Sequence, residues 1–343
     1  MVASLRTLAG GSSKQTAPTH RASLPPSEAY SGCVTKDSKP PNPLIAGMEL
    51  GGTKSVALIA RGRRILKSAR IPTGRPAETL TALGDLIAGW TARAGPIAAL
   101  GVGSFGPLGL DPTRADYGRI TSTPKPGWSN TDVLGALRAR FDIPTGFDTD
   151  VAGAALAESL WGAAIGAGTV VYLTVGTGVG GGVLVGGRPV HGLVHPEMGH
   201  VRIRRAPGDD FAGVCPFHGD CLEGLASGPA IAARAGAPAE TLAEDHPIWD
   251  LVADELAELT TTLILTLSPE RLLLGGGVAG GKPFLMAKIR AATAVRLGGY
   301  VAGLSPARLA RIIRAPGLGD RAGPLGAVAL GLRAMQDFPQ RSK

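Results

Sequence analysis

A cluster of sulfur and nitrogen ligands in the middle of the chain constrains the fold most strongly. It reads Cys215-Pro-Phe-His218-Gly-Asp-Cys221, and His200 lies a short distance upstream. Zinc prefers four nitrogen or sulfur ligands in a tetrahedron, and a closed set of four is typical of a structural site. The spacing therefore predicts structural zinc held by His200, Cys215, His218 and Cys221. His195 is an alternative fourth ligand, and a Cys215–Cys221 disulfide or two buried thiols are alternatives to the metal.

Composition and charge narrow the class of protein. The chain has 343 residues, enough for two domains, and 44% of them are hydrophobic. Its net charge of +8 invites a nucleic-acid interpretation. Residues 1–43 carry five basic and two acidic side chains, however, and the other basic residues lie in short scattered groups. We therefore expect no nucleic-acid partner. No apolar run reaches transmembrane length, so we expect no membrane partner and a cytoplasmic location.

The N-terminal 43 residues differ from the rest of the chain. They are rich in Ser, Thr, Pro and Ala and show no hydrophobic periodicity, which predicts a disordered tail. The first acidic residue is Glu28, and basic residues precede it, so an organellar transit peptide is one interpretation. A start codon placed too far upstream and a plain flexible tail remain equally open.

Two glycine-rich hairpins stand out in the remainder. Residues 44–50 and 55–60 are apolar strands around the turn Gly51-Gly-Thr-Lys54, and residues 170–185 repeat the strand–glycine–strand pattern. Neither turn leads into a helix as a P-loop does. Glycines let backbone N–H groups approach an anion closely, so both turns are candidate phosphate sites, although such turns are also ordinary hairpin chemistry.

The other expected elements alternate between strand and helix. Asp150 lies where a strand ends and a helix starts, a position that suits a helix cap as well as a reactive carboxylate. We expect Asn130 to cap the helix that it begins. Strands are predicted at 97–103, 144–150, 271–274 and 310–315, and helices at 76–94, 130–141, 150–162, 239–268 (one or two), 283–297 and 323–335.

Together these motifs resemble the sugar-kinase branch of the actin-like ATPases, namely the ROK group (repressors, open reading frames, kinases). The resemblance covers residues 44–335. It rests on a first phosphate motif at 49–54, a second at 173–182, a sugar-and-zinc signature at 197–200 with the Cys/His cluster, and an adenosine loop at 274–280.

The resemblance implies an α/β fold of two actin-like (ribonuclease H-like) domains with an interdomain cleft. A small domain would comprise residues 44–155 and a C-terminal helix at 320–336. A larger domain at 156–319 would carry the zinc. We also expect a homodimer, the commonest soluble homo-oligomer.

Within the group, His-Pro-Glu-Met-Gly-His and Phe-Asp-Thr-Asp look most like the bacterial zinc-containing fructokinases. The implied reaction is ATP-dependent phosphorylation of D-fructose to fructose 6-phosphate. Glucokinase, mannokinase and N-acetylmannosamine kinase activities are alternatives, and a sugar-sensing ROK regulator is the non-enzyme alternative. The departures from the wider family are Glu49 in place of Asp, Thr149 in place of Asn, and Ala152 in place of Asn.

The resemblance also assigns roles to residues. Asp150 would be the general base, and Glu49 would bind Mg²⁺, indirectly through water. The ATP-binding residues would be Gly51, Gly52, Thr53, Lys54, Gly176, Thr177, Gly178, Gly275, Gly276 and Gly277. The sugar-binding residues would be Thr149, Glu197, His200 and Glu223, so that His200 would serve both zinc and sugar.

Overall fold

The computed structural model describes residues 42–337, so the tail predicted at residues 1–43 lies outside this range except for its last two residues. The first sheet has the strand order β3-β2-β1-β4-β7. Its strands are β1 (Leu44–Leu50), β2 (Lys54–Arg61), β3 (Arg64–Pro72), β4 (Ala99–Ser104) and β7 (Thr145–Thr149). The first three form an antiparallel meander, whereas β4 and β7 run parallel to β1. The carboxyl ends of β1, β4 and β7 therefore meet at one edge, where ligands bind in α/β sheets.

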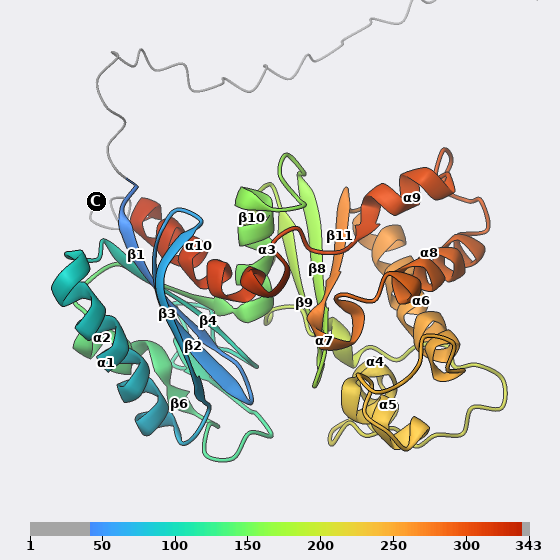
Figure 1. Ribbon diagram of the computed structural model, residues 1–343, viewed down its shortest axis with the longest axis horizontal. Coiled ribbons are helices and arrows are strands. Elements are labelled where there is room, and N and C mark those ends of the chain that lie inside the picture. Colours follow the sequence, from blue (N-terminus) through green and yellow to red (C-terminus); the bar gives the residue numbers. More distant parts are fainter. Residues whose placement is uncertain (1–41, 338–343) are drawn as a thin grey trace, which may run out of the picture. The chain divides into compact units, whose positions relative to one another are not determined.

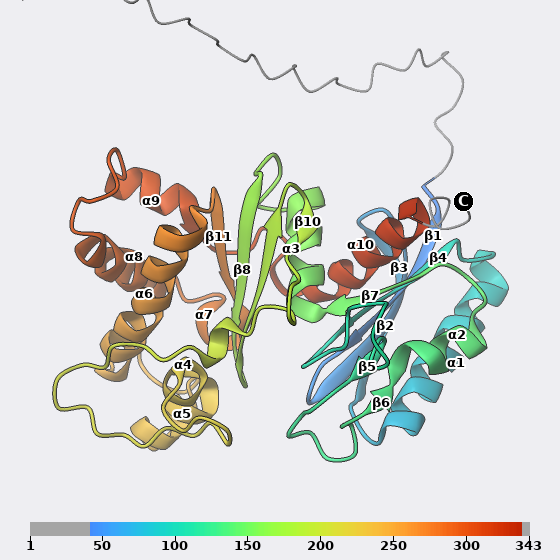
Figure 2. The same cartoon turned by 180° about the vertical axis from the view of Figure 1, so that it is seen from behind.

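Helices cover both faces of this sheet. One face packs against α1 (Pro76–Ala94) and α2 (Val133–Arg140) through a buried apolar cluster that includes Leu83 and Ile87. The opposite face packs against α10 (Ala322–Asp337), which Figures 1 and 2 show on the other side of the strands. The 3.6-residue spacing of apolar residues in α1 produces this one-sided burial.

The second sheet has the order β10-β9-β8-β11-β12. Its strands are β8 (Thr169–Val175), β9 (Val179–Val185), β10 (Arg188–Pro189), β11 (Arg271–Gly275) and β12 (Ile313–Arg314). The strands β8 and β9 form the predicted glycine hairpin, and β11 lies parallel to β8 on its other side. The turn after β8 and the loop after β11 are consequently neighbours.

Helices cover this sheet on both sides as well. The helix α3 (Asp150–Trp161) packs on one face, in the same buried cluster as α10. The long helices α6 (Ile248–Leu267) and α8 (Pro283–Leu297) cover the other face. The remaining elements are β5 (Arg119–Ile120), β6 (Thr131–Asp132), η1 (Met198–His200), α4 (Leu222–Ala226), α5 (Gly228–Ala235), α7 (Gly276–Ala279), α9 (Pro306–Ile312) and η2 (Gly319–Arg321).

One local prediction is wrong, and another is right only in part. Asn130 does not cap α2, because it adopts a left-handed φ of 60°, and the carboxylate of Asp132 instead accepts the Gly135 N–H at 2.8 Å. The strand predicted at residues 310–315 is shorter than expected, because residues 310–312 end α9, whose cap is Ser305, and only Ile313 and Arg314 form the strand. The short strand β12 follows because Ile313 and Arg314 pair with β11, a distant contact that the local pattern does not show.

Within residues 42–337, no helix combines the length and apolarity needed to cross a bilayer.

Candidate functional site

Carboxylates from separate elements converge at the carboxyl edge of the first sheet. The strand register places Glu49 of β1 opposite Gly103 of β4, and Gly103 opposite Asp148 of β7. Asp150 follows as the first residue of α3, and a Cβ at Gly103 would lie 3.3 Å from its Cα. The missing side chain at Gly103 therefore leaves room for Asp150 beside β4.

The protonation of this group reflects burial and crowding. Burial raises the pKa of Asp150 to about 6, although the Val151 N–H donates to its carboxylate at 2.9 Å. The pKa of Glu49 is raised to about 7, mainly by burial and secondly by the charge of Asp150. The pKa of Glu197 is also raised to about 7, mainly by burial and secondly by the nearby charges of Glu223 and Asp150. Several carboxyls with raised pKa in one neighbourhood are typical of a site prepared for acid–base chemistry.

The two predicted phosphate turns lie at strand ends with open backbone. A side chain at Gly52 would meet nothing within 4 Å, and Thr53 and Lys54 beside it are exposed. In the second sheet, a Cβ at Gly176 would lie 3.7 Å from the amide nitrogen of Gly277, so the β8–β9 turn and the loop after β11 adjoin. Gly277 itself also faces open space. Glycine backbone without a covering side chain can be approached closely by an anion.

The Cys/His cluster brings four side chains together. One ligand atom from each of His200, Cys215, His218 and Cys221 lies within 4.8 Å of all the others. The Sγ atoms of Cys215 and Cys221 are 3.7 and 3.5 Å from Nδ1 of His200. A tetrahedral zinc ion with bonds of about 2.0–2.3 Å needs ligand separations of this size, so the residues fit the metal.

His195 does not belong to this group of four. Its Nε2 instead accepts the N–H of Leu108 at 3.0 Å, and its ring is buried. Of the two histidines considered as fourth ligand, the structure therefore brings His200 to the cysteines.

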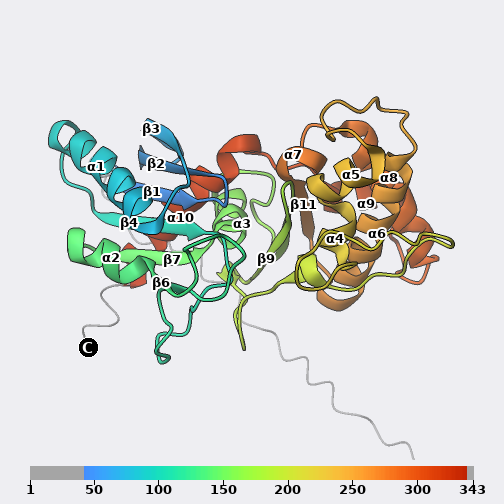
Figure 3. The same ribbon diagram turned by 90° about the horizontal axis from the view of Figure 1, so that it is seen from below.

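The knuckle at residues 215–221 leads directly to the second phosphate turn. Cys221 is followed by α4, which lies beside β9 (Figure 3). Oε2 of Glu223 in that helix accepts the Val179 N–H at 3.0 Å. The next helix, α5, begins at Gly228, whose N–H donates to the Gly176 carbonyl at 2.7 Å. Both ends of the β8–β9 turn are thus held by the segment that follows the metal ligands.

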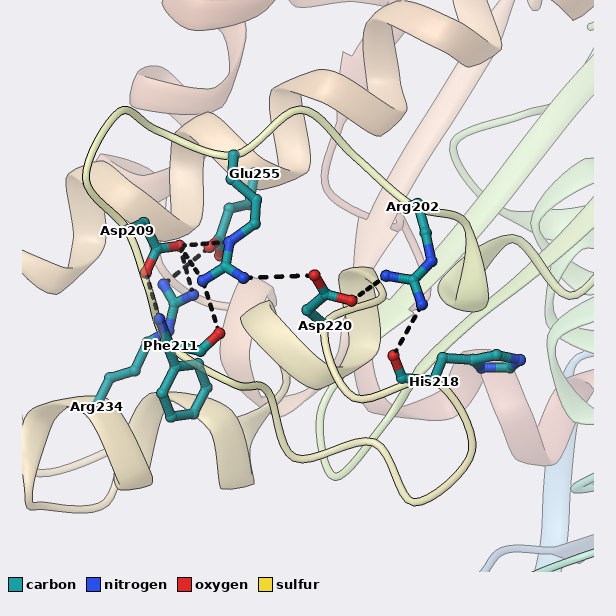
Figure 4. Close-up of polar contacts among 8 residues, drawn as sticks. Arg202, Asp209, Phe211, His218, Asp220, Arg234 and Glu255 are labelled. Carbon is teal, nitrogen blue, oxygen red and sulfur yellow. Dashed lines mark hydrogen bonds and ion pairs between the residues drawn. The ribbon is translucent and has the colours of Figure 1, made fainter.

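An ion-pair network anchors the long connection between His200 and the knuckle. Arg234 of α5 pairs with Glu255 of α6 at 2.8 Å and with Asp209 of the connection at 3.0 Å, and all three are largely buried (Figure 4). Arg205 reaches Asp209 at 3.2 Å and Asp220 of the knuckle at 3.4 Å. Burial raises the pKa of Glu255 to about 7 against the opposing charge of Arg234. The network fixes a segment that has no regular secondary structure.

Two predicted sugar-binding residues have local partners. The Thr149 hydroxyl caps α3 by accepting the Ala152 N–H at 3.1 Å, so Thr149 rather than Asp150 provides the side-chain cap. One oxygen of Glu223 bonds to Val179. Sequence reasoning missed the buried carboxylate of Glu158 and the network around Arg234. Their only local signal is a charged residue on an otherwise apolar helix face.

Comparison with known proteins agrees with this geometry. The ROK family model matches residues 45–334. The chain belongs to the ROK family. A fructokinase from Zymomonas mobilis is 47% identical over 292 residues, covering 84% of this chain and 96% of the relative. A fructokinase from Pediococcus pentosaceus is 40% identical, covering 86% and 99%.

The solved structure of a ROK hexokinase from Thermus thermophilus superimposes with a TM-score of 0.70 at 28% identity, covering 86% of this chain and 99% of that one. The fold is therefore the actin-like ATPase fold of ROK kinases, as predicted from the motifs.

Proposed function

We propose that this protein is an ATP-dependent fructokinase that transfers the γ-phosphoryl group to the 6-hydroxyl of D-fructose. Asp150 carries the proposal, because its carboxyl is buried with a raised pKa and its charge helps to raise the pKa of Glu49 and of Glu197. The choice of fructose is supported by relatives named fructokinase that are 40–47% identical over most of the chain.

The proposed chemistry depends on alignment and charge. Asp150 accepts the proton of the attacking hydroxyl, which requires the ionised carboxylate. Glu197 and His200 bind sugar hydroxyls, and Glu223 contributes its second oxygen. The turns at 51–54 and 176–178, with the loop at 275–277, donate backbone N–H groups to ATP. Mg²⁺ bound with ATP would neutralise phosphate charge, and Glu49 would hold the ion indirectly through water.

We further propose that the chain acts as two domains that close over the substrates. One comprises residues 44–155 and 320–336, and the other comprises residues 156–319. Closure would exclude water, which otherwise competes for the phosphoryl group. The expected homodimer stays a prediction that light scattering would test.

The test is a coupled ATP-consumption assay with fructose, glucose, mannose and N-acetylmannosamine. We expect turnover to be fastest on fructose. A preference for another hexose would keep the kinase chemistry and overturn the sugar assignment. An absence of turnover on all four sugars would overturn the enzyme assignment in favour of a sugar-sensing regulator.

We propose that His200, Cys215, His218 and Cys221 hold a structural zinc ion that supports the β8–β9 turn. Cys221→Ser should lose the metal, measured by elemental analysis, from about one zinc per chain in the unmodified protein. It should also lower the melting temperature and raise KM for ATP, since α4 and α5 hold Val179 and Gly176.

Cys33→Ser is the matched control, because Cys33 is the remaining cysteine and lies outside the described residues. It should keep zinc and activity. Full zinc in Cys221→Ser would contradict the ligand set.

A further inference from the structure

Two histidines outside the catalytic group and the metal group join the second sheet to the first. His191 and His195 lie on the segment between β10 and η1. Nε2 of His191 is 3.1 Å from the buried carboxylate of Asp148 on β7. Nε2 of His195 accepts the Leu108 N–H at 3.0 Å, in the loop that follows β4. The segment is therefore attached to the first sheet at two points.

The ring of His195 is enclosed, with 5% of its surface exposed. A Cβ on Gly106 would lie 3.1 Å from both Cε1 and Nε2, so the glycine backbone packs directly on the ring. Because Nε2 accepts a backbone N–H, the neutral ring must carry its proton on Nδ1. Burial lowers the pKa of His195, which favours this neutral form.

The protonated nitrogen faces the sugar-binding side of the site. Nδ1 of His195 is 3.6 Å from Oε1 of Glu197 and 3.5 Å from the Pro196 carbonyl. A small closing movement would bring the Glu197 carboxylate within hydrogen-bond distance of this N–H, since contacts in unliganded sites are often long. His195 thus lies between the loop after β4 and the Glu197 carboxylate, which precedes η1.

We propose that His195 is a positioning residue that holds the Glu197 carboxylate toward the sugar when the segment at 190–197 is attached to Leu108. The inference rests on the proposed sugar-kinase function. His195 touches neither substrate in this account and acts only through Glu197. The orientation of the Glu197 carboxylate then depends on the contact between His195 and Leu108. The carboxylate is oriented fully only when the loop after β4 is in place.

A double-mutant cycle tests the dependence on Glu197. His195→Phe keeps a ring and removes both nitrogens. We expect it to lower kcat/KM for fructose about 10-fold, the effect of losing an orienting hydrogen bond, with KM for ATP changed less than about twofold. In a Glu197→Gln background, His195→Phe should lower kcat/KM for fructose by less than about threefold, because the group through which His195 acts has already been altered.

Rescue tests the Leu108 contact. In His195→Gln the side-chain oxygen can accept the Leu108 N–H in place of Nε2. The kcat/KM of this variant for fructose should therefore be about threefold higher than that of His195→Phe. His246→Asn is the matched control, because His246 accepts the Ile248 N–H at the start of α6. It should leave the fructose constants unchanged.

Several outcomes would overturn the inference. Additive losses in the cycle would mean that His195 does not act through Glu197, and equal rises in KM for fructose and ATP would indicate a merely structural role. A Gln variant no better than Phe would exclude the Leu108 contact. If His195→Phe does not fold, His195→Leu, which also lacks both nitrogens, takes its place in the cycle. Unmodified protein that is inactive on every hexose would instead refute the proposed function itself.

Discussion

Asp150 illustrates how a single carboxyl can be prepared for proton transfer. It starts α3, where helix geometry directs free N–H groups toward an acidic side chain, and the Val151 N–H binds its oxygen. That contact lowers the pKa, yet burial raises the pKa more, and the balance is about 6. The residue therefore remains ionised at neutral pH while keeping a useful affinity for a proton.

This balance predicts the pH dependence of activity. The base works only when ionised, so kcat/KM should fall about tenfold per pH unit below a pH near 6 and level off above it. Asp150→Asn should lower kcat by about 10²- to 10⁴-fold. Any acid limb left in this variant would report Glu49 and Glu197, whose pKa values are also raised, to about 7. The assay is a pH series of initial rates on fructose.

The exposed Asp245 supplies the control, and Asp245→Asn should retain both the rate and the acid limb. An Asp150→Asn protein that kept most of its turnover would exclude Asp150 as the base.

The contact between α10 and the first sheet depends on glycine. A Cβ at Gly101 of β4 would lie 1.8 Å from the Ala327 carbonyl oxygen, and one at Gly331 would lie 2.7 Å from Ile45. A Cβ at Gly326 would similarly lie 2.5 Å from the carbonyl carbon of Gly153 in α3. Helix backbone therefore approaches strand and helix backbone directly, which any side chain would prevent.

Gly101→Ala should consequently destabilise the protein by about 3 kcal/mol or more, since backbone rather than a mobile side chain must move. Urea unfolding followed by circular dichroism measures the change. Gly89→Ala in α1 is the control, because Gly89 is exposed and meets nothing within 4 Å. It should stabilise by about 0.5–1 kcal/mol through helix propensity. Equal effects at the two sites would refute the packing argument.

The buried carboxylate of Glu158 connects distant parts of the whole molecule. It belongs to α3 and accepts N–H groups from Ala163, Gly317 and Leu318 at 2.6, 2.9 and 2.8 Å. Residues 317 and 318 lie where the chain leaves the second sheet and returns toward α10 on the first. A charged acceptor with three donors can satisfy this buried turn fully.

Glu158→Gln should cost about 2 kcal/mol, because the amide NH₂ group would face at least one backbone donor. We also expect unfolding to lose cooperativity, with a lower m-value, since this contact joins segments that belong to different sheets. The exposed Glu240 offers the comparison, and Glu240→Gln should be neutral. A neutral Glu158→Gln would show that the return of the chain does not depend on this carboxylate.

Features that depend on near neighbours could be predicted from the chain alone. The glycine hairpins, the helices α1 and α8 and the clustering of the zinc ligands follow from spacing over a few residues, which sets periodicity, turn chemistry and ligand reach. The position of Asp150 at a strand end also follows from local pattern. Several independent motifs together were sufficient to predict the family.

Other features depend on residues that meet only after folding. The choice of His200 over His195 as the fourth ligand depends on Leu108, which binds His195 from the first sheet. Glu158 has partners far along the chain, and β12 forms only because β11 is beside it. Local sequence carries no information on such contacts, because burial and hydrogen bonding at these positions are set by the packing of distant segments.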